Sequence, residues 1–127
     1  MLRSISAITL VTQDMAAATR FYESLGFTAR DGASDAFTSY PVGPTWLNLI
    51  AATEEPAGPM PLWGRVIIHV DDVDAMHDRV LQAGYEAETE PADAFWGERY
   101  FHVKDPDGHK IEATFWDMEM AKKLGME

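Results

Sequence analysis

The sequence contains no cysteine at any of its 127 positions. This absence excludes disulfide bonds, thiolate nucleophiles and metal sites held by cysteine. Long apolar runs are also missing, because the apolar stretch at 5–11 is short, contains Ser6 and Thr9, and ends in polar residues. It resembles neither a signal peptide nor the roughly 18 apolar residues of a membrane-spanning helix. We therefore expect a soluble, cytoplasmic protein.

Basic residues are scarce: 10 Lys and Arg stand against 21 Asp and Glu, which gives a formal net charge of −11. Such a charge repels the phosphate backbone, so we expect no nucleic-acid partner. An acidic surface can serve solubility alone, or it can attract a cationic small molecule, and both interpretations stay open. The 46% of hydrophobic residues is typical of a globular domain with a core.

The chain contains two copies of one pattern, 58 positions apart. Each copy reads as an apolar strand, an aspartate, an amphipathic helix, a glycine followed by an aromatic residue, and further strands. The matching positions are 7–11 and 65–69 for the strand, Asp14 and Asp72 for the aspartate, and Gly26 and Gly84 for the glycine. The aspartates are expected to cap the helix N-termini and the glycines to end the helices.

Runs of β-branched and apolar residues between turn residues predict the strands. They are 4–11, 27–29, 36–40 and 46–52 in the first copy, and 65–70, 86–90, 98–104 and 109–116 in the second. Turn residues predict connections at 31–32, 41–44 and 105–108, and the prolines at 54–61 predict a linker between the copies. A short C-terminal helix is expected at 117–124, packing through Met118, Ala121 and Leu124.

This order of elements predicts an α+β fold. We expect one domain over residues 1–127, made of two βαβββ modules at about 4–53 and 62–117, followed by the C-terminal helix. The modules would form a curved mixed sheet around a cleft, with the helices on the outer face and the inner face left for a ligand.

Two segments carry a resemblance to a known family. Residues 96–101 (WGERYF) with 105–112 (DPDGHKIE) resemble the second-module signature of the glyoxalase/bleomycin resistance/dioxygenase superfamily, also called vicinal oxygen chelate. Asp14 with 21–27 (FYESLGF) is similar to its first-module helix. The pattern is nearest to the metal-free, bleomycin-resistance-like branch. The resemblance implies a small-molecule cleft and a homodimer.

Metal-dependent members of this superfamily bind a divalent ion with His and Glu side chains on the first and last strand of each module. The matching positions here are Ala7, Asn48, Arg65 and Glu112. Only Glu112 is a usual ligand, and Arg65 is a permanent cation. We therefore expect no metal, and instead a pair between Arg65 and Glu112. This pair could simply stabilise the sheet, or Arg65 could anchor a carboxylate, phenolate or carbonyl of a ligand.

Aromatic residues and histidines complete the candidate site. Strand alternation directs Trp46 and Trp116 into the cleft, and Trp96 lies in a loop before a cleft strand. Their rings suit a planar or cationic ligand, although ordinary core packing is the alternative. Alternation also directs His69 and His102 to the cleft, as metal or hydrogen-bonding groups. The remaining expectations are Trp63 before the strand of Arg65, Phe37 or Tyr40 as a cleft wall, and His77 and His109 near the surface.

The sequence thus predicts a ligand-binding set of Asn48, Arg65, Glu112, Trp46, Trp96, Trp116, His69 and His102. We expect a binding protein that sequesters a small aromatic or cationic compound, as in antibiotic resistance, without a metal or another cofactor and without catalysis. The alternative is a lyase, isomerase or dioxygenase of the superfamily with an atypical or absent metal site, in which Glu112 is the candidate base. The identity of the ligand does not follow from the sequence.

Overall fold

The computed structural model describes residues 1–55, 58–117 and 119, so the expected helix at 117–124 lies almost entirely outside the described residues. The chain divides into two compact units. Unit 1 comprises Met1–Pro61 together with Asp105–His109, and unit 2 comprises Leu62–Lys104 and the chain from Lys110 onward. Each unit combines one helix with one mixed sheet, so the fold is α+β as predicted.

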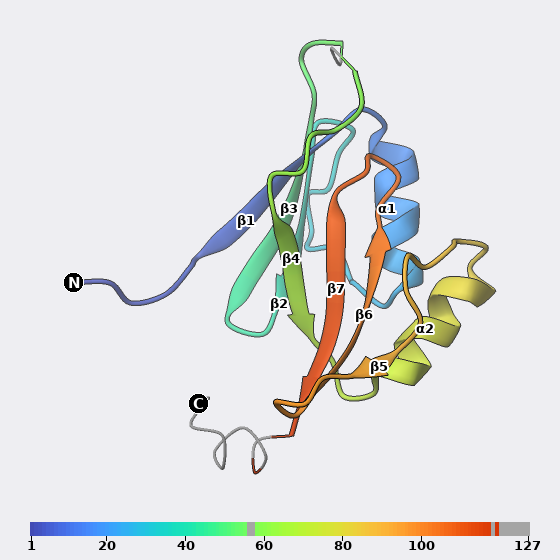
Figure 1. The fold of residues 1–127 in the computed structure, drawn as a ribbon. Coiled ribbons are helices and arrows are strands. Elements are labelled where there is room, and N and C mark those ends of the chain that lie inside the picture. Colours follow the sequence, from blue (N-terminus) through green and yellow to red (C-terminus); the bar gives the residue numbers. More distant parts are fainter. Residues whose placement is uncertain (56–57, 118, 120–127) are drawn as a thin grey trace. The chain divides into compact units, whose positions relative to one another are not determined.

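Unit 1 contains β1 (Ala7–Thr12), α1 (Met15–Ser24), β2 (Phe37–Val42) and β3 (Thr45–Ala51), in that order (Figure 1). The strand order in its sheet is β1-β3-β2. The first strand therefore pairs with the last strand in parallel, and β2 pairs with β3 antiparallel.

Unit 2 contains β4 (Arg65–His69), α2 (Val73–Gln82), β5 (Ala92–Asp93), β6 (Glu98–Lys104) and β7 (Lys110–Trp116). Its strand order is β4-β7-β6-β5. As in unit 1, the first and last strands are parallel neighbours, and the hairpin partner is antiparallel. The same arrangement in both units follows the repeat that the sequence predicts.

The two helices begin with the same cap. The Asp14 carboxylate accepts a hydrogen bond of 3.0 Å from the backbone N–H of Ala17, and Asp72 accepts one of 3.0 Å from Ala75. Their backbone angles are nearly equal, φ −148° and ψ 96° at Asp14 against φ −145° and ψ 103° at Asp72. Each carboxylate satisfies a backbone donor that has no partner within the helix, so both predicted caps are confirmed.

The two helices also end in the same way. Gly26 and Gly84 adopt positive φ angles of 107° and 90°, which a glycine reaches without steric cost. In each copy the glycine N–H and the N–H of the next, aromatic residue bond back to the last helical turn, which is the Schellman arrangement. These bonds are Gly26 to Glu23 (3.1 Å), Phe27 to Tyr22 (3.2 Å), Gly84 to Leu81 (3.0 Å) and Tyr85 to Val80 (3.1 Å).

Two predicted strands do not form. Residues 27–29 are irregular, because Phe27 packs its ring against Tyr22 and Tyr40, at centroid distances of 5.4 and 5.6 Å. The apolar side chain of Phe27 thus packs at the end of the helix, and the residue is not part of a β-strand. In the second copy, 86–90 contributes only an isolated bridge between Ala87 and Val103, and the short β5 forms at 92–93 instead.

The turn predicted at 41–44 is shorter than expected. Pro41 and Val42 belong to β2, and the chain reverses at Gly43 and Pro44. Proline is tolerated in this strand because β2 is the outer strand of its sheet, where an N–H is not needed on both sides. The turn at 105–108 forms as predicted, closed by a 2.9 Å bond from the Gly108 N–H to the Asp105 carbonyl.

Each sheet packs its helix against one face, and side chains alternate between that face and the opposite one. In unit 2, Phe101 contacts His77 of α2 and Arg99 pairs with Asp74 of α2. Residues of the other parity therefore lie on the opposite side, which we call the far face of unit 2. It carries Arg65, Ile67 and His69 on β4, Glu98, Tyr100, His102 and Lys104 on β6, and Lys110, Glu112, Thr114 and Trp116 on β7.

The cores lie between helix and sheet. In unit 1 the fully buried side chains include Phe21, Tyr22, Tyr40 and Leu49, and in unit 2 they include Val80, Phe101 and Val103. Within the described part of the chain, neither helix has the length and apolar character needed to cross a membrane.

Candidate functional site

Three side chains meet on the far face of unit 2. Glu112 of β7 lies opposite His102 of β6, and Arg65 reaches them from the start of β4. Oε1 of Glu112 is 2.7 Å from Nε2 of His102 and 3.1 Å from Nη1 of Arg65. Nε2 and Nη1 are 3.0 Å apart. The pair that the sequence predicts between Arg65 and Glu112 is present, and His102 joins it.

Both contacts end on one oxygen of Glu112. The Arg65 guanidinium donates to this oxygen in a charge-assisted bond. Nε2 of His102 lies 2.7 Å from the same oxygen, and the tautomer of the imidazole sets which atom of this contact donates. The carboxylate is 7% exposed and the Arg65 side chain 42%. One end of the cluster is therefore buried, while the arginine stays accessible to a ligand.

A second buried carboxylate, Glu98, holds the loop before β6. Its Oε1 accepts from the indole N–H of Trp96 at 3.1 Å, and its Oε2 accepts from the hydroxyl of Thr114 at 2.6 Å. The sequence analysis missed Glu98, although it shares the alternation of His102 four residues later. These bonds fix the orientation of the Trp96 ring.

The aromatic side chains of this face come from two strands and the loop. The Tyr100 ring lies 5.4 Å from the His102 ring, a contact that the sequence analysis also missed. Trp116 is the register partner of Glu98 and is partly buried, and Trp96 packs edge-on against Phe95 at 5.0 Å. Flat surfaces thus lie beside a fixed cluster of charged groups.

Unit 1 contains the other two predicted residues, Asn48 and Trp46. Asn48 donates to the Thr9 hydroxyl at 3.3 Å and accepts from the Ser39 hydroxyl at 2.6 Å. The Arg30 guanidinium lies 5.6 Å from the centre of the Trp46 ring, within cation–π range. Both residues therefore have partners within their own unit.

Comparison with known families decides the identity of the fold. The family model described as Glyoxalase/Bleomycin resistance protein/Dioxygenase superfamily matches residues 4–113. The chain belongs to this superfamily. No curated protein is significantly similar to it in sequence.

Solved structures of the superfamily and of related proteins share the fold. A glyoxalase/bleomycin resistance protein/dioxygenase from Nocardioides is 24% identical, with a TM-score of 0.70, over 91% of this chain and 85% of that one. A hypothetical protein from S. aureus is 24% identical, with a TM-score of 0.74, over 91% and 95%. The fosfomycin resistance protein FosX of Listeria monocytogenes, a mutant complexed with Mn(II) and 1S,2S-dihydroxypropylphosphonic acid, is 17% identical, with a TM-score of 0.78, over 98% and 99%.

The metal chemistry of this superfamily can be tested against the donor set in unit 2. Oε1 of Glu112 and Nε2 of His102 are two atoms that could ligate a metal ion. Nη1 of Arg65 lies within 3.1 Å of both of these atoms. A divalent ion needs further lone pairs and no adjacent cation, so this cluster as arranged does not fit one. Among the described residues, no group of three or more His, Asp or Glu side chains is placed to hold a metal ion.

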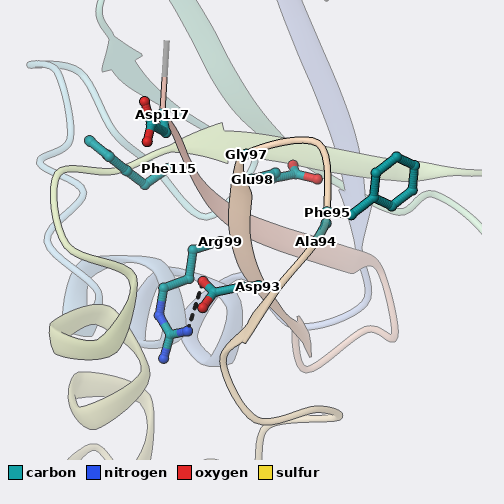
Figure 2. A pocket seen from close by; sticks show the side chains of 8 residues that line it. All are labelled: Asp93, Ala94, Phe95, Gly97, Glu98, Arg99, Phe115 and Asp117. Atoms are coloured by element: carbon teal, nitrogen blue, oxygen red, sulfur yellow. Dashed lines mark hydrogen bonds and ion pairs between the residues drawn. The ribbon is translucent and has the colours of Figure 1, made fainter. Parts of the chain in front are cut away.

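A pocket of about 330 Å³ adjoins the Trp96 loop (Figure 2). Arg99 lies on one side, bonded to Asp93 at 3.0 Å and to Asp74 at 2.8 Å, and the hydrogen bond to Arg99 lowers the pKa of Asp74. Phe95 and Phe115 also line it (Figure 2). The arginine that lines this pocket is already bonded to two carboxylates. It is therefore less able to bind a polar group of a ligand than Arg65 is.

Several predicted side chains have other roles. His109 is 5% exposed and its Nε2 lies 2.8 Å from the Val11 carbonyl, so the expectation of a surface position was wrong. Tyr40 is fully buried beneath α1 and donates to Glu23 at 3.1 Å, so it forms no ligand wall, whereas Phe37 is 41% exposed. At the end of β4, the His69 ring lies 5.7 Å from the Phe115 ring.

Proposed function

We propose that this member of the superfamily binds a small aromatic compound on the far face of unit 2, without a metal ion, and holds it without transforming it. Sequestration of this kind would protect a cell from a toxic compound, as in antibiotic resistance. A homodimeric state and a cytoplasmic location are further expectations of this proposal.

One observation carries the metal-free part of the proposal. Nη1 of Arg65 lies 3.1 Å from the Glu112 carboxylate and 3.0 Å from His102, so a cation of the chain itself neutralises the buried carboxylate. A dication at the same point would face the guanidinium at short range in a partly desolvated site. Arginine cannot lose its proton to make room for the ion.

The aromatic part of the proposal rests on rings held in fixed orientations. Glu98 holds the indole of Trp96, and Tyr100 packs beside His102. Rings that are already ordered lose little entropy when a planar ligand stacks on them. The exposed side of Arg65 lies on the same face and can bond a polar group of that ligand.

Calorimetric titration with Mn(II) and Zn(II), together with quenching of tryptophan fluorescence by an aromatic compound library, tests this proposal. We expect no stoichiometric metal binding, and we expect quenching that a chelator leaves unchanged. Arg65→Ala should weaken the binding of a responding compound about tenfold, equivalent to about 1.4 kcal/mol. Arg20→Ala, a change of an exposed arginine on α1, is the control and should have no effect.

A gain-of-function variant sharpens the metal test. Arg65→His removes the cation and adds a third donor beside His102 and Glu112, so we expect it to bind Zn(II) where the unchanged protein does not. The proposal is wrong if the unchanged protein binds one metal ion per chain and loses it in Glu112→Ala. It is equally wrong if no aromatic compound quenches the fluorescence.

A second candidate function follows from the geometry of His102. Nε2 of His102 lies 2.7 Å from Glu112, and the tautomer that donates to this carboxylate leaves Nδ1 as the basic nitrogen, with no partner among the described residues. A histidine oriented in this way by a carboxylate can act as a general base, with Arg65 stabilising negative charge on a carbonyl oxygen. This geometry favours His102 over Glu112 as the base.

Deuterium exchange distinguishes this enzyme from a binding protein. If His102 is a base, the protein should accelerate exchange of the methylene protons next to the ketone of phenylpyruvate above the rate in buffer, as followed by proton NMR. His102→Gln should abolish the acceleration while the ligand still binds. If phenylpyruvate binds but its protons exchange no faster than in buffer, the second candidate function is wrong and binding remains the function.

A further inference from the structure

A row of basic residues crosses the sheet of unit 2. Lys110 of β7 is the register partner of Arg65 on β4 and also of Lys104 on β6. Register partners on neighbouring strands project from the same face, so the three cations lie side by side on the far face. We call Arg65, Lys110 and Lys104 the cationic row.

This row is costly unless something compensates it. Like charges directly opposite one another destabilise a sheet, and neighbouring strands are only about 4.8 Å apart. The chain has 10 basic residues against 21 acidic ones, so three adjacent cations are unexpected on composition alone. Such a cost points to a function for the combined positive charge.

Within the part of the chain that the structure describes, the two outer cations have acidic partners and the central one does not. Arg65 bonds Glu112 at 3.1 Å, and Lys104 lies 3.7 Å from a carboxylate oxygen of Glu88. For Lys110, the described residues provide no ion pair or side-chain hydrogen bond. The acidic residues of the neighbouring turn are engaged elsewhere, Asp105 with Tyr22 and Asp107 with the backbone of Gln13.

We propose that the cationic row binds the acidic group of the ligand, a carboxylate, phosphate or phosphonate, so that the ligand of this site is an aromatic acid and not a cation. This inference rests on the proposed function, because the row continues from Arg65 on the same face. Lys110 supplies the unpaired charge, and Arg65 contributes the guanidinium nitrogens not bonded to Glu112.

The net charge of −11 does not oppose such a ligand at short range. At physiological ionic strength the screening length is about 8 Å, so distant carboxylates act weakly on a ligand anion in contact with the row. A hydrogen-bonded anion interacts mainly with the cations beside it. Local charge therefore decides the sign of the preferred ligand.

Three matched probes test the inference: naphthoate, naphthylmethanol and naphthylmethylammonium share one ring system and differ in charge. Their dissociation constants are measured by tryptophan fluorescence and by NMR titration. We expect naphthoate to bind about tenfold more tightly than naphthylmethanol, and the ammonium compound to bind most weakly. Lys110→Glu should remove the preference for naphthoate and leave the affinity for naphthylmethanol unchanged.

The variants separate this inference from the function on which it rests. Lys110→Arg should keep the preference, and Arg20→Ala is the control for a general loss of positive charge. If naphthylmethylammonium binds most tightly, or if Lys110→Glu binds naphthoate normally, the inference is wrong and aromatic binding still stands. If none of the three probes and no other aromatic compound binds, the proposed function fails as well.

Discussion

The two units share one backbone plan and differ in the chemistry of equivalent side chains. Asn48 and Glu112 lie 64 positions apart, each in the last strand of its unit. Asn48 bonds two hydroxyl groups, those of Thr9 and Ser39, whereas Glu112 bonds a guanidinium and an imidazole. One unit thus carries a neutral hydrogen-bond cluster where the other carries a charged one.

The adjacent row of the sheet shows the same contrast. Unit 2 has Arg65, Lys110 and Lys104 in register, and the corresponding row of unit 1 is Ala7, Trp46 and Pro41. The caps of both helices are nearly identical in geometry, so the backbone plan is kept while this row of side chains differs. A repeated backbone fixes where side chains project and leaves their chemistry free to diverge.

The largest expected effect concerns the charged and neutral clusters. Glu112→Ala leaves Arg65 and His102 without their shared acceptor, so we expect the free energy of unfolding to fall by about 2 kcal/mol. Asn48→Ala, the equivalent change in unit 1, should cost about 1 kcal/mol because its partners are neutral hydroxyls. Urea unfolding measures both, and equal losses would show that the charges add nothing to stability.

A buried hydroxyl distinguishes the two helices. Tyr22 of α1 donates to Asp105 at 2.7 Å, while the equivalent residue of α2 is Val80. Burial, more than the nearby Asp105, raises the pKa of Tyr22, so its hydroxyl stays protonated and remains a donor. Tyr22→Phe should cost about 1.5 kcal/mol because the Asp105 carboxylate stays buried. The control, Tyr40→Phe, should cost less in the same urea experiment.

The helix caps should behave alike. Asp14→Ala and Asp72→Ala each remove one bond of 3.0 Å to the first helical turn, so each should cost about 1 kcal/mol. Thermal unfolding of both variants measures the losses. If the two losses of stability differ severalfold, the two caps share their geometry but do not contribute equally to stability.

The smallest expected effect is a pH dependence that belongs to unit 1. Burial raises the pKa of Asp105 above its ordinary value of 3.8, against the opposing effect of the Tyr22 hydrogen bond. The folded state therefore holds this proton more tightly than the unfolded state. The resulting stability is complete below pH 3.8 and is lost as the pH rises through the raised pKa.

Asp105→Asn does not titrate and can keep the same hydrogen bonds, with its amide donating to the Tyr22 oxygen. Its stability relative to the unchanged protein should therefore increase as the pH rises from 4 to 7. Guanidinium unfolding across this range measures the difference, with Asp31→Asn in an exposed loop as the control. A difference that stays constant with pH would contradict the role given to burial.

Much of the local structure could be predicted from sequence. The Asp14 and Asp72 caps, the Gly26 and Gly84 helix ends and the strand at 98–104 depend on nearest neighbours, and the structure confirms them. Phe27 shows the limit of this approach, because its apolar character suits a strand as well as a helix end. Only its contacts with Tyr22 and Tyr40 distinguish the two.

The candidate site shows the same division. The alternation of residues in the strands suffices to predict that Arg65, His102 and Glu112 share a face. It does not show that His102 and Arg65 contact a single oxygen of Glu112, or that Lys110 lies between two cations, because both depend on strand order. His109 lies at a turn, where exposure is the usual expectation, and its burial follows from a contact with Val11, 98 positions away.

The sequence by itself determined the repeat, the helix caps and ends, and the residue types available for chemistry. These features depend on backbone sterics and on hydrogen bonds between residues close in the chain. The tertiary structure decided which charges meet, because the parallel pairing of β4 with β7 brings Arg65 to Lys110 and Glu112. Interactions between charges depend steeply on distance and burial, and for residues far apart in the chain only the folded sheet determines both.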